Sequence, residues 1–366
     1  MINSVVIIPA LKPDERMVDY VKALSEQGFA KIIVINDGSP EEYDDFFARA
    51  DEVENCVVLR HVVNRGKGCA LKTAMKHYLD YFHGYDGIIT ADADGQHTLE
   101  DAVNIANLMS TMDDALILGS RDFSGEDIPA RSRFGNRMTS VIFKMAHGCY
   151  LRDTQTGLRG IPDKLVATFA DLRGERYEYE MNMLIECARR NIKMIEEPIQ
   201  TVYIDDNSSS HFHVIRDSFK IYKIILGDLI KYVISGVISF LVDQGLFNLL
   251  DLVILPLLLG GVLKNTSLIW IYTAVGVARV FSSLLNYALN KRIVFRQTEK
   301  SPAFLVKYAA LVVMAAAVSG LLVWVITSLT PLPKAIVKPV IDLIFVLINY
   351  TLQRSWVFKK SDSELE

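Results

Sequence analysis

The sequence predicts two domains of different class, a mostly parallel α/β sheet followed by a bundle of membrane-spanning helices. Over the first half of the 366 residues, short apolar segments alternate with helical patterns. Alternation of this kind favours a mostly parallel sheet with helices on both faces. The second half contains four apolar stretches, each long enough to cross a bilayer. The chain is 51% hydrophobic, which is high for a soluble protein.

The predicted strands of the first half each end in a short polar segment. The strands are "SVVIIPA", "KIIVINDGS", "VVLRH" and "GIITADADG", with helices expected near residues 15–28, 41–51 and 68–82. The segments at their ends are "PALKPDE", "NDGS", "NRGKG" and "DADGQH". The carboxyl ends of parallel strands lie at one edge of a sheet, where open α/β folds bind ligands. We therefore expect the functional site at this edge.

Charge and cysteine usage separate the two halves. Residues 1–229 contain 26 Lys and Arg against 36 Asp and Glu, a balance of −10, whereas residues 230–366 contain 13 against 7, a balance of +6. We expect no nucleic-acid partner. The four cysteines form no CxxC pair and all lie in the first half, which predicts reduced, mostly buried thiols in a cytosolic domain. The first residues lack a basic leader and a cleavage site, and we expect them to form a core strand.

The four apolar stretches cover roughly residues 231–250, 268–290, 303–328 and 335–353. Positive charges collect between the second and third stretches and after the fourth: Lys291, Arg292, Arg296, Lys300 and Lys307, then Arg354, Lys359 and Lys360. The positive-inside rule therefore predicts four spans, with the first domain, the central link and the C-terminus in the cytoplasm.

The membrane half contains an internal repeat. "NYALNKRIVF" (286–295) closes the second stretch and "NYTLQRSWVF" (349–358) closes the fourth, while "IKY" at 230 and "VKY" at 306 open the first and third. Two copies of a two-span hairpin predict a compact four-helix unit. Three ionisable residues, Asp243, Arg279 and Asp342, lie inside the spans at a similar depth, and we expect Arg279 to pair with at least one of the aspartates.

A segment between the two domains has the pattern of an interfacial helix. "VIRDSFKIYKIILGDLI" places apolar residues on one helical face and basic residues beside them. The apolar face would hold Phe219, Tyr222, Ile225 or Leu226, and Leu229; the basic residues are Arg216, Lys220 and Lys223. The predicted boundaries are 1–213 for the first domain, 214–229 for this helix, 230–358 for the membrane domain and 359–366 for a tail.

The segment "DADGQH" contains the most informative polar residues. An extended backbone sends Asp92 and Asp94 to the same side, where they could face one hard cation. A structural alternative is that the segment only leads into a helix, with Thr98 as N-cap and Asp101 in the capping-box position. An EF-hand loop is excluded, because His97 stands where that loop requires glycine.

Seven motifs occur in an order that resembles family 2 glycosyltransferases of the polyprenyl-phosphate type, similar to dolichol-phosphate mannose synthase. They are "IIPA", "INDGS", "NRGKGCALKTA", "DADGQH", "GSRDF", "RFGNR" and "DTQTGLRG". The membrane half resembles the GtrA-like domain. The resemblance implies a GT-A fold and a metal-dependent inverting transfer of a sugar from a nucleotide-diphosphate sugar to a polyprenyl phosphate. It also implies a Mg²⁺ or Mn²⁺ cofactor and a catalytic domain at the cytoplasmic membrane face.

The resemblance assigns roles to individual residues. The metal would be held by Asp92, Asp94 and Gln96, and the donor would contact Pro9, Ala10, Glu15, Asp37, Gly38, Lys67 and Asp92. The acceptor phosphate would be gripped by Arg121, Arg131 and Arg133, and the catalytic residues would be Asp94, Arg121 and Arg133. Because a phosphate monoester is already largely a dianion at neutral pH, the acceptor needs no strong general base.

Other residues leave alternatives open. Asp153, Gln155 and Arg159 fit the family's second loop, whereas Glu180 could equally be an exposed helical glutamate, and His211 and His213 either contact a ligand or belong to a polar loop. Near the expected nucleoside the sequence departs from the family pattern at Leu11, Lys12, Pro13 and Asn36. The sequence therefore does not identify the base of the donor nucleotide.

Two rival functions remain. A processive polysaccharide synthase should carry Gln-x-x-Arg-Trp, and "QRSW" at 353–356 has the wrong spacing. The other rival is a lipid-linked sugar flippase with a nucleotide-sugar-binding domain. The sequence leaves the oligomeric state open, a homo-oligomer included.

Overall fold

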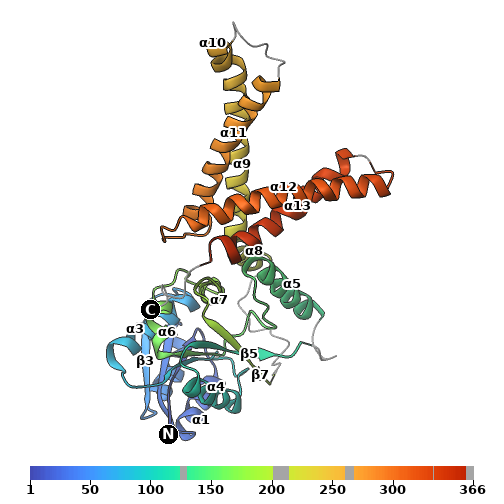
Figure 1. Ribbon diagram of the computed structural model, residues 1–366. Helices are drawn as coiled ribbons and strands as arrows, with labels where there is room; N and C mark the ends of the chain where they lie inside the picture. The colour runs from blue at the N-terminus through green and yellow to red at the C-terminus, as the bar shows by residue number, and fades with distance from the viewer. Residues whose placement is uncertain (124–129, 201–213, 260–267, 333, 360–366) are drawn as a thin grey trace. The chain divides into compact units, whose positions relative to one another are not determined.

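The computed structural model describes residues 1–123, 130–200, 214–259, 268–332 and 334–359. The chain divides into two compact units, Met1–Ile225 and Leu226–Glu366, and Figure 1 shows their elements. The first unit is an α/β domain and the second is helical.

A seven-stranded sheet forms the centre of the first unit. Its order is β3-β2-β1-β4-β6-β5-β7. The strands are β1 Ile2–Ala10, β2 Phe29–Asp37, β3 Cys56–His61, β4 Gly87–Thr90, β5 Ala115–Arg121, β6 Arg159–Pro162 and β7 Lys193–Ile199. All neighbouring strands are parallel except that β6 runs antiparallel to β4 and β5. The predicted mostly parallel sheet is therefore confirmed.

Helices cover both faces of this sheet. They are α1 Glu15–Glu26, α2 Asp44–Asp51 with the preceding 3₁₀ turn η1 Glu41–Tyr43, α3 Lys67–Tyr81, α4 Leu99–Thr111, α5 Ala130–His147, α6 Asp163–Ala170, α7 Glu178–Arg190 and α8 Val214–Ile225. Val6 and Ile8 of β1 join one core cluster with α1, α2 and α4. Val5 and Ile7 point to the other face and are equally buried. Burial on both faces explains why β1 reads as a continuous apolar run.

The interfacial pattern of the sequence falls on α8, which packs within the first unit. Ile221 and Ile225 are buried, whereas Phe219 is 71% exposed. His147 Nε2 lies 3.1 Å from Ile225 O, and Thr139 Oγ1 lies 3.4 Å from Tyr222 OH, which ties α8 to α5. Of the apolar residues expected on one membrane-facing stripe, Ile225 contributes to the protein interior instead.

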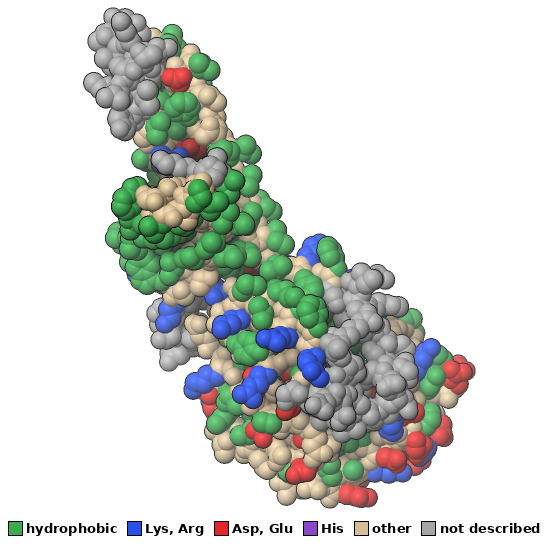
Figure 2. All heavy atoms as spheres, turned by 90° about the vertical axis from the view of Figure 1, so that its right-hand side faces the viewer, with side chains coloured by type: hydrophobic (Ala, Val, Ile, Leu, Met, Phe, Trp, Pro, Cys, Tyr) green, Lys and Arg blue, Asp and Glu red, His purple; other side chains and the backbone are tan. Residues whose placement is uncertain are grey.

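The second unit consists of long apolar helices. They are α9 Gly227–Leu249, η3 Leu250–Ile254, α10 Leu255–Leu259, α11 Leu268–Leu289, η4 Asn290–Val294, α12 Ala303–Leu329, α13 Lys334–Leu352 and η5 Gln353–Val357. Within the described residues, three stretches are long and apolar enough to cross a membrane: Gly227–Leu258, Ala303–Leu329 and Val340–Val357. The predicted span at 268–290 corresponds to α11, which is not among these three, so four spans stay a prediction. On the face shown in Figure 2 the surface of this unit is largely hydrophobic.

Contacts between the two hairpins of this unit follow the sequence repeat. The Tyr232 ring meets the Tyr350 ring edge-on, and the Tyr308 ring lies tilted against the Tyr287 ring, with 5.4 Å between ring centroids in both cases. Each pair joins the opening tyrosine of one hairpin to the closing tyrosine of the other. Equivalent residues therefore make equivalent contacts.

Two further contacts join residues that are equivalent to each other. Asn290 Nδ2 donates to Gln353 Oε1 at 3.0 Å, and Phe295 stacks on Phe358 at 5.2 Å. Asn290 and Gln353 are buried, and each opens a π-helical turn, η4 or η5. Residues that touch their own equivalents lie on the axis that relates the repeats, so the unit has an approximate two-fold axis.

The predicted intramembrane ion pair is present. Arg279 Nη2 lies 3.4 Å from Asp243 Oδ2, and Ser282 Oγ donates to Asp243 Oδ1 at 2.8 Å. The Asp243 side chain is 8% exposed and that of Arg279 is 67% exposed. The expectation that Arg279 pairs with an aspartate is confirmed, although only the carboxylate lies in the interior.

Candidate active site

Three neighbouring strands bring the residues expected at the donor site to one edge of the sheet. β1 lies between β2 and β4 and runs parallel to both. Pro9 and Ala10 end β1, Asp37 ends β2, and Asp92 follows β4 by two residues. Parallel neighbours end at the same edge, so these residues share it.

Lys67 is the centre of an ion-pair cluster at this edge. Its Nζ lies 2.6 Å from Asp92 Oδ1 and 2.9 Å from Glu180 Oε1. Lys67 opens α3 directly after Gly66, whose φ of +94° favours glycine, and a Cβ there would lie 2.5 Å from Glu175 O. The three side chains of the cluster are 11–30% exposed, so water screens their charges only in part.

The cluster keeps Lys67 and Asp92 charged. Burial opposes the charged form of Lys67, but the carboxylates of Asp92 and Glu180 outweigh burial and raise the pKa of the ammonium. Burial also opposes ionisation of Asp92, but the positive charge of Lys67 and the nearby His97 ring outweigh it and lower the pKa of this carboxyl. The ammonium and the carboxylate of Asp92 are therefore both ionised at neutral pH.

Asp94 lies in a less favourable electrostatic environment. Burial and the negative charge of Asp92 raise the pKa of its carboxyl. The backbone N–H of Gln96 donates to Asp94 Oδ1 at 3.0 Å. A divalent cation would compensate the negative charges of two neighbouring carboxylates, so Asp94 is suited to bind one. In the described part of the chain no group of three His, Cys, Asp or Glu side chains converges.

The loop 153–158 packs directly against Asp92. Thr90 Oγ1 donates to Gly157 O at 2.7 Å, and a Cβ on Gly157 would lie 2.3 Å from Asp92 Oδ2. Only glycine permits this approach. On the other side, His97 is buried with Nε2 3.4 Å from Asp92 Oδ2, longer than a good hydrogen bond. Asp92 is thus fixed by Lys67, His97 and the close backbone of Gly157.

Asp37 organises the loop that precedes α3. Its Oδ1 accepts from Arg65 N at 3.0 Å and lies 2.7 Å from His61 Nδ1, and its Oδ2 accepts from Gly66 N at 2.8 Å. His61 Nε2 in turn lies 2.9 Å from Thr73 Oγ1. The buried Asp37 carboxylate therefore holds the backbone just before Lys67.

Two of the residues that depart from the family pattern, Lys12 and Asn36, both bond to Ser39. Asn36 Oδ1 accepts from Ser39 N at 2.8 Å, and Ser39 Oγ accepts from Lys12 N at 2.9 Å. Lys12 has a positive φ of 52°. These contacts connect the loop after β1 to the turn at Gly38.

Arg121 at the end of β5 is oriented by Asp153. Arg121 Nε lies 2.7 Å from Asp153 Oδ2, and Nη2 lies 3.2 Å from Oδ1. Asp153 is fully buried and also accepts from Gln155 N at 2.9 Å. The guanidinium lies over the Phe123 ring at 5.2 Å. A two-point pair of this kind fixes the plane of the guanidinium.

The remaining predicted residues are spread more widely. Arg133 is exposed on α5, Arg131 lies on the same helix with its side chain outside the described residues, and His211 and His213 also lie outside them. Glu15, at the start of α1, accepts from Arg49 Nη1 of α2 at 2.8 Å. The structure therefore groups Asp92, Asp94 and Lys67 but gives Glu15 a partner elsewhere.

Arg159 is a buried structural residue. It is 1% exposed and donates to Thr156 O at 3.0 Å and to Glu180 O at 2.7 Å. Burial lowers the pKa of its guanidinium, against the charge of Glu180. Arg159 joins the loop 153–158 to α7 and so places Glu180 near Lys67.

Sequence reasoning left out His97 and Gly157 and gave Glu180 no role. Both His97 and Gly157 belong to the quoted motifs, so the motifs contained a signal that was not used. Glu180 carries no local signal, because "RYEYEMNML" does not show which glutamate faces inward. Its partner Lys67 is supplied by a distant helix.

Comparisons with known proteins identify both halves. Residues 5–163 match the family described as glycosyl transferase family 2, and residues 231–358 match the family described as GtrA/DPMS, transmembrane domain.

Three known proteins are similar to part of the chain. The UDP-N-acetylglucosamine–dolichyl-phosphate N-acetylglucosaminyltransferase of Methanococcus voltae is 27% identical over 54% of this chain and 85% of its own length. The undecaprenyl-phosphate mannosyltransferase of Micrococcus luteus is 28% identical over 47% and 71%. The solved glucosyl-3-phosphoglycerate synthase of Mycobacterium tuberculosis aligns with 61% of this chain and 79% of its own, with a TM-score of 0.45 and 16% identity.

Each family match lies within one of the two compact units of the structure. The chain is a glycosyltransferase of family 2 that also carries a GtrA/DPMS transmembrane domain.

Proposed function

We propose that the protein transfers a sugar from a nucleotide-diphosphate sugar to a polyprenyl phosphate at the cytoplasmic face of the membrane, with inversion at the anomeric carbon. The observation that carries the proposal is the Asp92–Lys67–Glu180 cluster beside Asp94 at the carboxyl edge of the sheet. The names of the two relatives, which act on dolichyl phosphate and undecaprenyl phosphate, support a polyprenyl phosphate acceptor.

Asp92, Asp94 and Gln96 fit a divalent cation. They offer carboxylate and amide oxygens, which hard cations prefer, and burial together with the negative charge of Asp92 raises the pKa of the Asp94 carboxyl. When bound, Mg²⁺ or Mn²⁺ would neutralise charge on the departing nucleoside diphosphate. Lys67 holds Asp92 in place through Oδ1, and Gly157 keeps the loop 153–158 close to it.

The acceptor side requires two anions to meet. An oxygen of the polyprenyl phosphate forms the new bond to the anomeric carbon while the bond to the nucleoside diphosphate breaks, and no proton has to be removed from the dianion. We assign Arg121 and Arg133 to the acceptor phosphate, with Asp153 orienting Arg121. Pro9, Ala10, Asp37 and Gly38 border the nucleoside, and Asp37 acts by fixing the loop before Lys67.

The test is a donor screen with purified full-length protein, Mn²⁺ and a polyprenyl phosphate. We expect one nucleotide sugar to yield a lipid-extractable product that carries a single sugar and depends on the acceptor. A product that grows with time into a polymer would instead identify a processive synthase. Donor hydrolysis with no lipid product for every donor would contradict transfer to a polyprenyl phosphate.

A further inference from the structure

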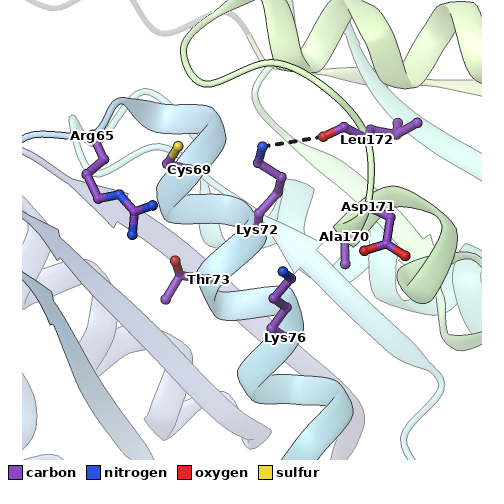
Figure 3. A pocket seen from close by; sticks show the side chains of 8 residues that line it. All are labelled: Arg65, Cys69, Lys72, Thr73, Lys76, Ala170, Asp171 and Leu172. Carbon is purple, nitrogen blue, oxygen red and sulfur yellow. Dashed lines mark hydrogen bonds between the residues drawn. The ribbon is translucent and has the colours of Figure 1, made fainter.

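A pocket lies beside α3, and none of the residues that line it belongs to the ion-pair cluster. Its volume is about 390 Å³, and its lining residues are Arg65, Cys69, Lys72, Thr73, Lys76, Ala170, Asp171 and Leu172, as Figure 3 shows. Lys72 and Lys76 follow Lys67 by five and nine residues, which is about 140° and about 180° around a helix of 3.6 residues per turn. The pocket therefore faces away from the side of α3 that carries Lys67.

Basic residues gather in this pocket although the unit is acidic. Residues 1–229 carry a net charge of −10, yet three cations and one carboxylate line the pocket. In the described part of the chain neither Arg65 nor Lys76 forms an ion pair, and the ammonium of Lys72 donates only to Leu172 O at 3.3 Å. Other basic residues of the unit, such as Arg60 and Lys164, do pair with carboxylates. Like charges that line one pocket without forming ion pairs to carboxylates favour an anion between them.

The groups that line the pocket match a phosphate. Arg65 offers a planar fork of N–H donors, Lys72 and Lys76 offer ammonium groups, and Thr73 offers a hydroxyl. A pocket of about 390 Å³ has room for a group larger than one phosphate. We propose that this pocket binds a phosphate-bearing anion at a site separate from the donor site.

Occupation of the pocket is connected to the loop before Lys67. In the tautomer that donates from Nδ1 to Asp37, His61 Nε2 accepts a hydrogen bond from Thr73 Oγ1. Thr73 has a single proton to donate. An anion that accepts a hydrogen bond from the Thr73 hydroxyl competes with His61 for it. His61 in turn contacts Asp37, which accepts from Arg65 N and Gly66 N. A change in this loop would alter donor binding at Lys67, and that consequence rests on the proposed function, whereas anion binding in the pocket does not.

The binding test uses full-length protein in detergent, EDTA to prevent metal-dependent binding, and inorganic pyrophosphate as the titrant in calorimetry. We expect saturable binding that falls at least tenfold in the Lys72→Ala/Lys76→Ala variant. The matched control is Lys22→Ala/Lys164→Ala, which removes the same charge from exposed positions on other helices and should bind as the native protein does.

Two results would overturn the site. Equal affinity in the native protein and the Lys72→Ala/Lys76→Ala variant places the anion elsewhere. Loss of binding in Lys67→Ala, with binding kept in the double variant, places the anion at the donor edge. Because no sugar transfer is measured, these results are independent of the proposed reaction.

Two further experiments identify the source of the phosphate and test the connection from the pocket through Thr73 to His61. A short-chain phosphatidic acid that competes with pyrophosphate identifies a lipid headgroup, and a failure to compete identifies a soluble phosphate. In protein with ¹³C-labelled histidine, pyrophosphate should shift the His61 ring resonance. Thr73→Val should keep most of the affinity and abolish the shift; a shift that persists in Thr73→Val would contradict the connection.

Discussion

The carboxylate of Asp92 has contacts on three sides, and Asp94 next to it has few. Lys67 lies 2.6 Å from Asp92, and His97 and Gly157 close the other directions. Asp94 receives only the N–H of Gln96 among the contacts described above. The two aspartates of one motif therefore differ: Asp92 is preorganised by the protein, and Asp94 depends on a ligand for compensation.

Asp94→Asn should remove most sugar transfer and leave the fold intact. A neutral amide is a poorer ligand for a divalent cation, and no ion pair of Asp94 is lost. Transfer should fall at least tenfold in an assay with Mn²⁺, while the thermal midpoint of the variant stays near that of the native protein. Full activity of Asp94→Asn, or of native protein in EDTA, would rule out the metal assignment.

Lys67→Met should destabilise the protein more at neutral than at acidic pH. Without the ammonium, Asp92 and Glu180 lose their shared partner, and the pKa of Asp92 is no longer lowered. Because a lowered folded-state pKa contributes stability above the unfolded pKa and loses it as pH falls, the native advantage should shrink toward acid. The cost at pH 7 should lie between the ~1 kcal/mol of an exposed pair and the ~3 kcal/mol of a buried one. Chemical denaturation at pH 7 and at pH 3, below the ordinary pKa of an aspartate carboxyl, with Lys22→Met as control, measures the difference.

Gly157→Ala should impair catalysis through Asp92. The new Cβ would lie 2.3 Å from Asp92 Oδ2, so the carboxylate or the loop has to move. We expect a fall in Mn²⁺ affinity together with a fall in kcat. Gly135→Ala is the control, because a Cβ there meets nothing within 4 Å. Native Mn²⁺ affinity in Gly157→Ala would show that this approach does not position the metal ligand.

At the scale of elements, α9 and α11 are joined by charge as well as by apolar packing. Asp243 is buried, forms an ion pair with Arg279 and accepts a hydrogen bond from Ser282. A lone carboxylate at this position would be costly in the membrane. Two such helices therefore depend on each other for electrostatic compensation.

Arg279→Asp should lower the yield of folded protein in detergent, because it places two carboxylates together. Adding Asp243→Arg restores opposite charges in reversed order and should recover part of the yield. Size-exclusion profiles of the two variants compare them directly. If the double variant is no better than Arg279→Asp, the pair does not stabilise the hairpin, and the exposed Arg279 instead interacts mainly with its surroundings.

At the scale of the whole molecule, the sequence predicted the division into two units, the first four strands and the helices of the membrane unit. α9, α11, α12 and α13 cover the four predicted stretches. Apolar periodicity specifies such elements locally. The order β4-β6-β5-β7, with β6 antiparallel, and the pairing of Arg121 with Asp153 depend on contacts between distant segments, and no local pattern encodes them.

The number of spans decides on which side of the membrane Thr298 lies. With four spans, the link between α11 and α12 is on the same side as the first unit; if α11 does not span, it is on the opposite side. Labelling of Thr298→Cys in intact and opened cells, in a background without the four native cysteines, should place it in the cytoplasm. Labelling from outside would contradict the four-span topology.

The contact between Asn290 and Gln353 records how the membrane domain arose. In a homodimer, a residue on the two-fold axis touches its own copy. Here the residues on the axis are repeat equivalents, so the domain has the form of a homodimer of hairpins that became one polypeptide through gene duplication. After fusion the two copies no longer need to have the same sequence, and the equivalent positions Arg279 and Asp342 carry opposite charges. An asymmetric function can therefore evolve in one hairpin while the other preserves the shared framework.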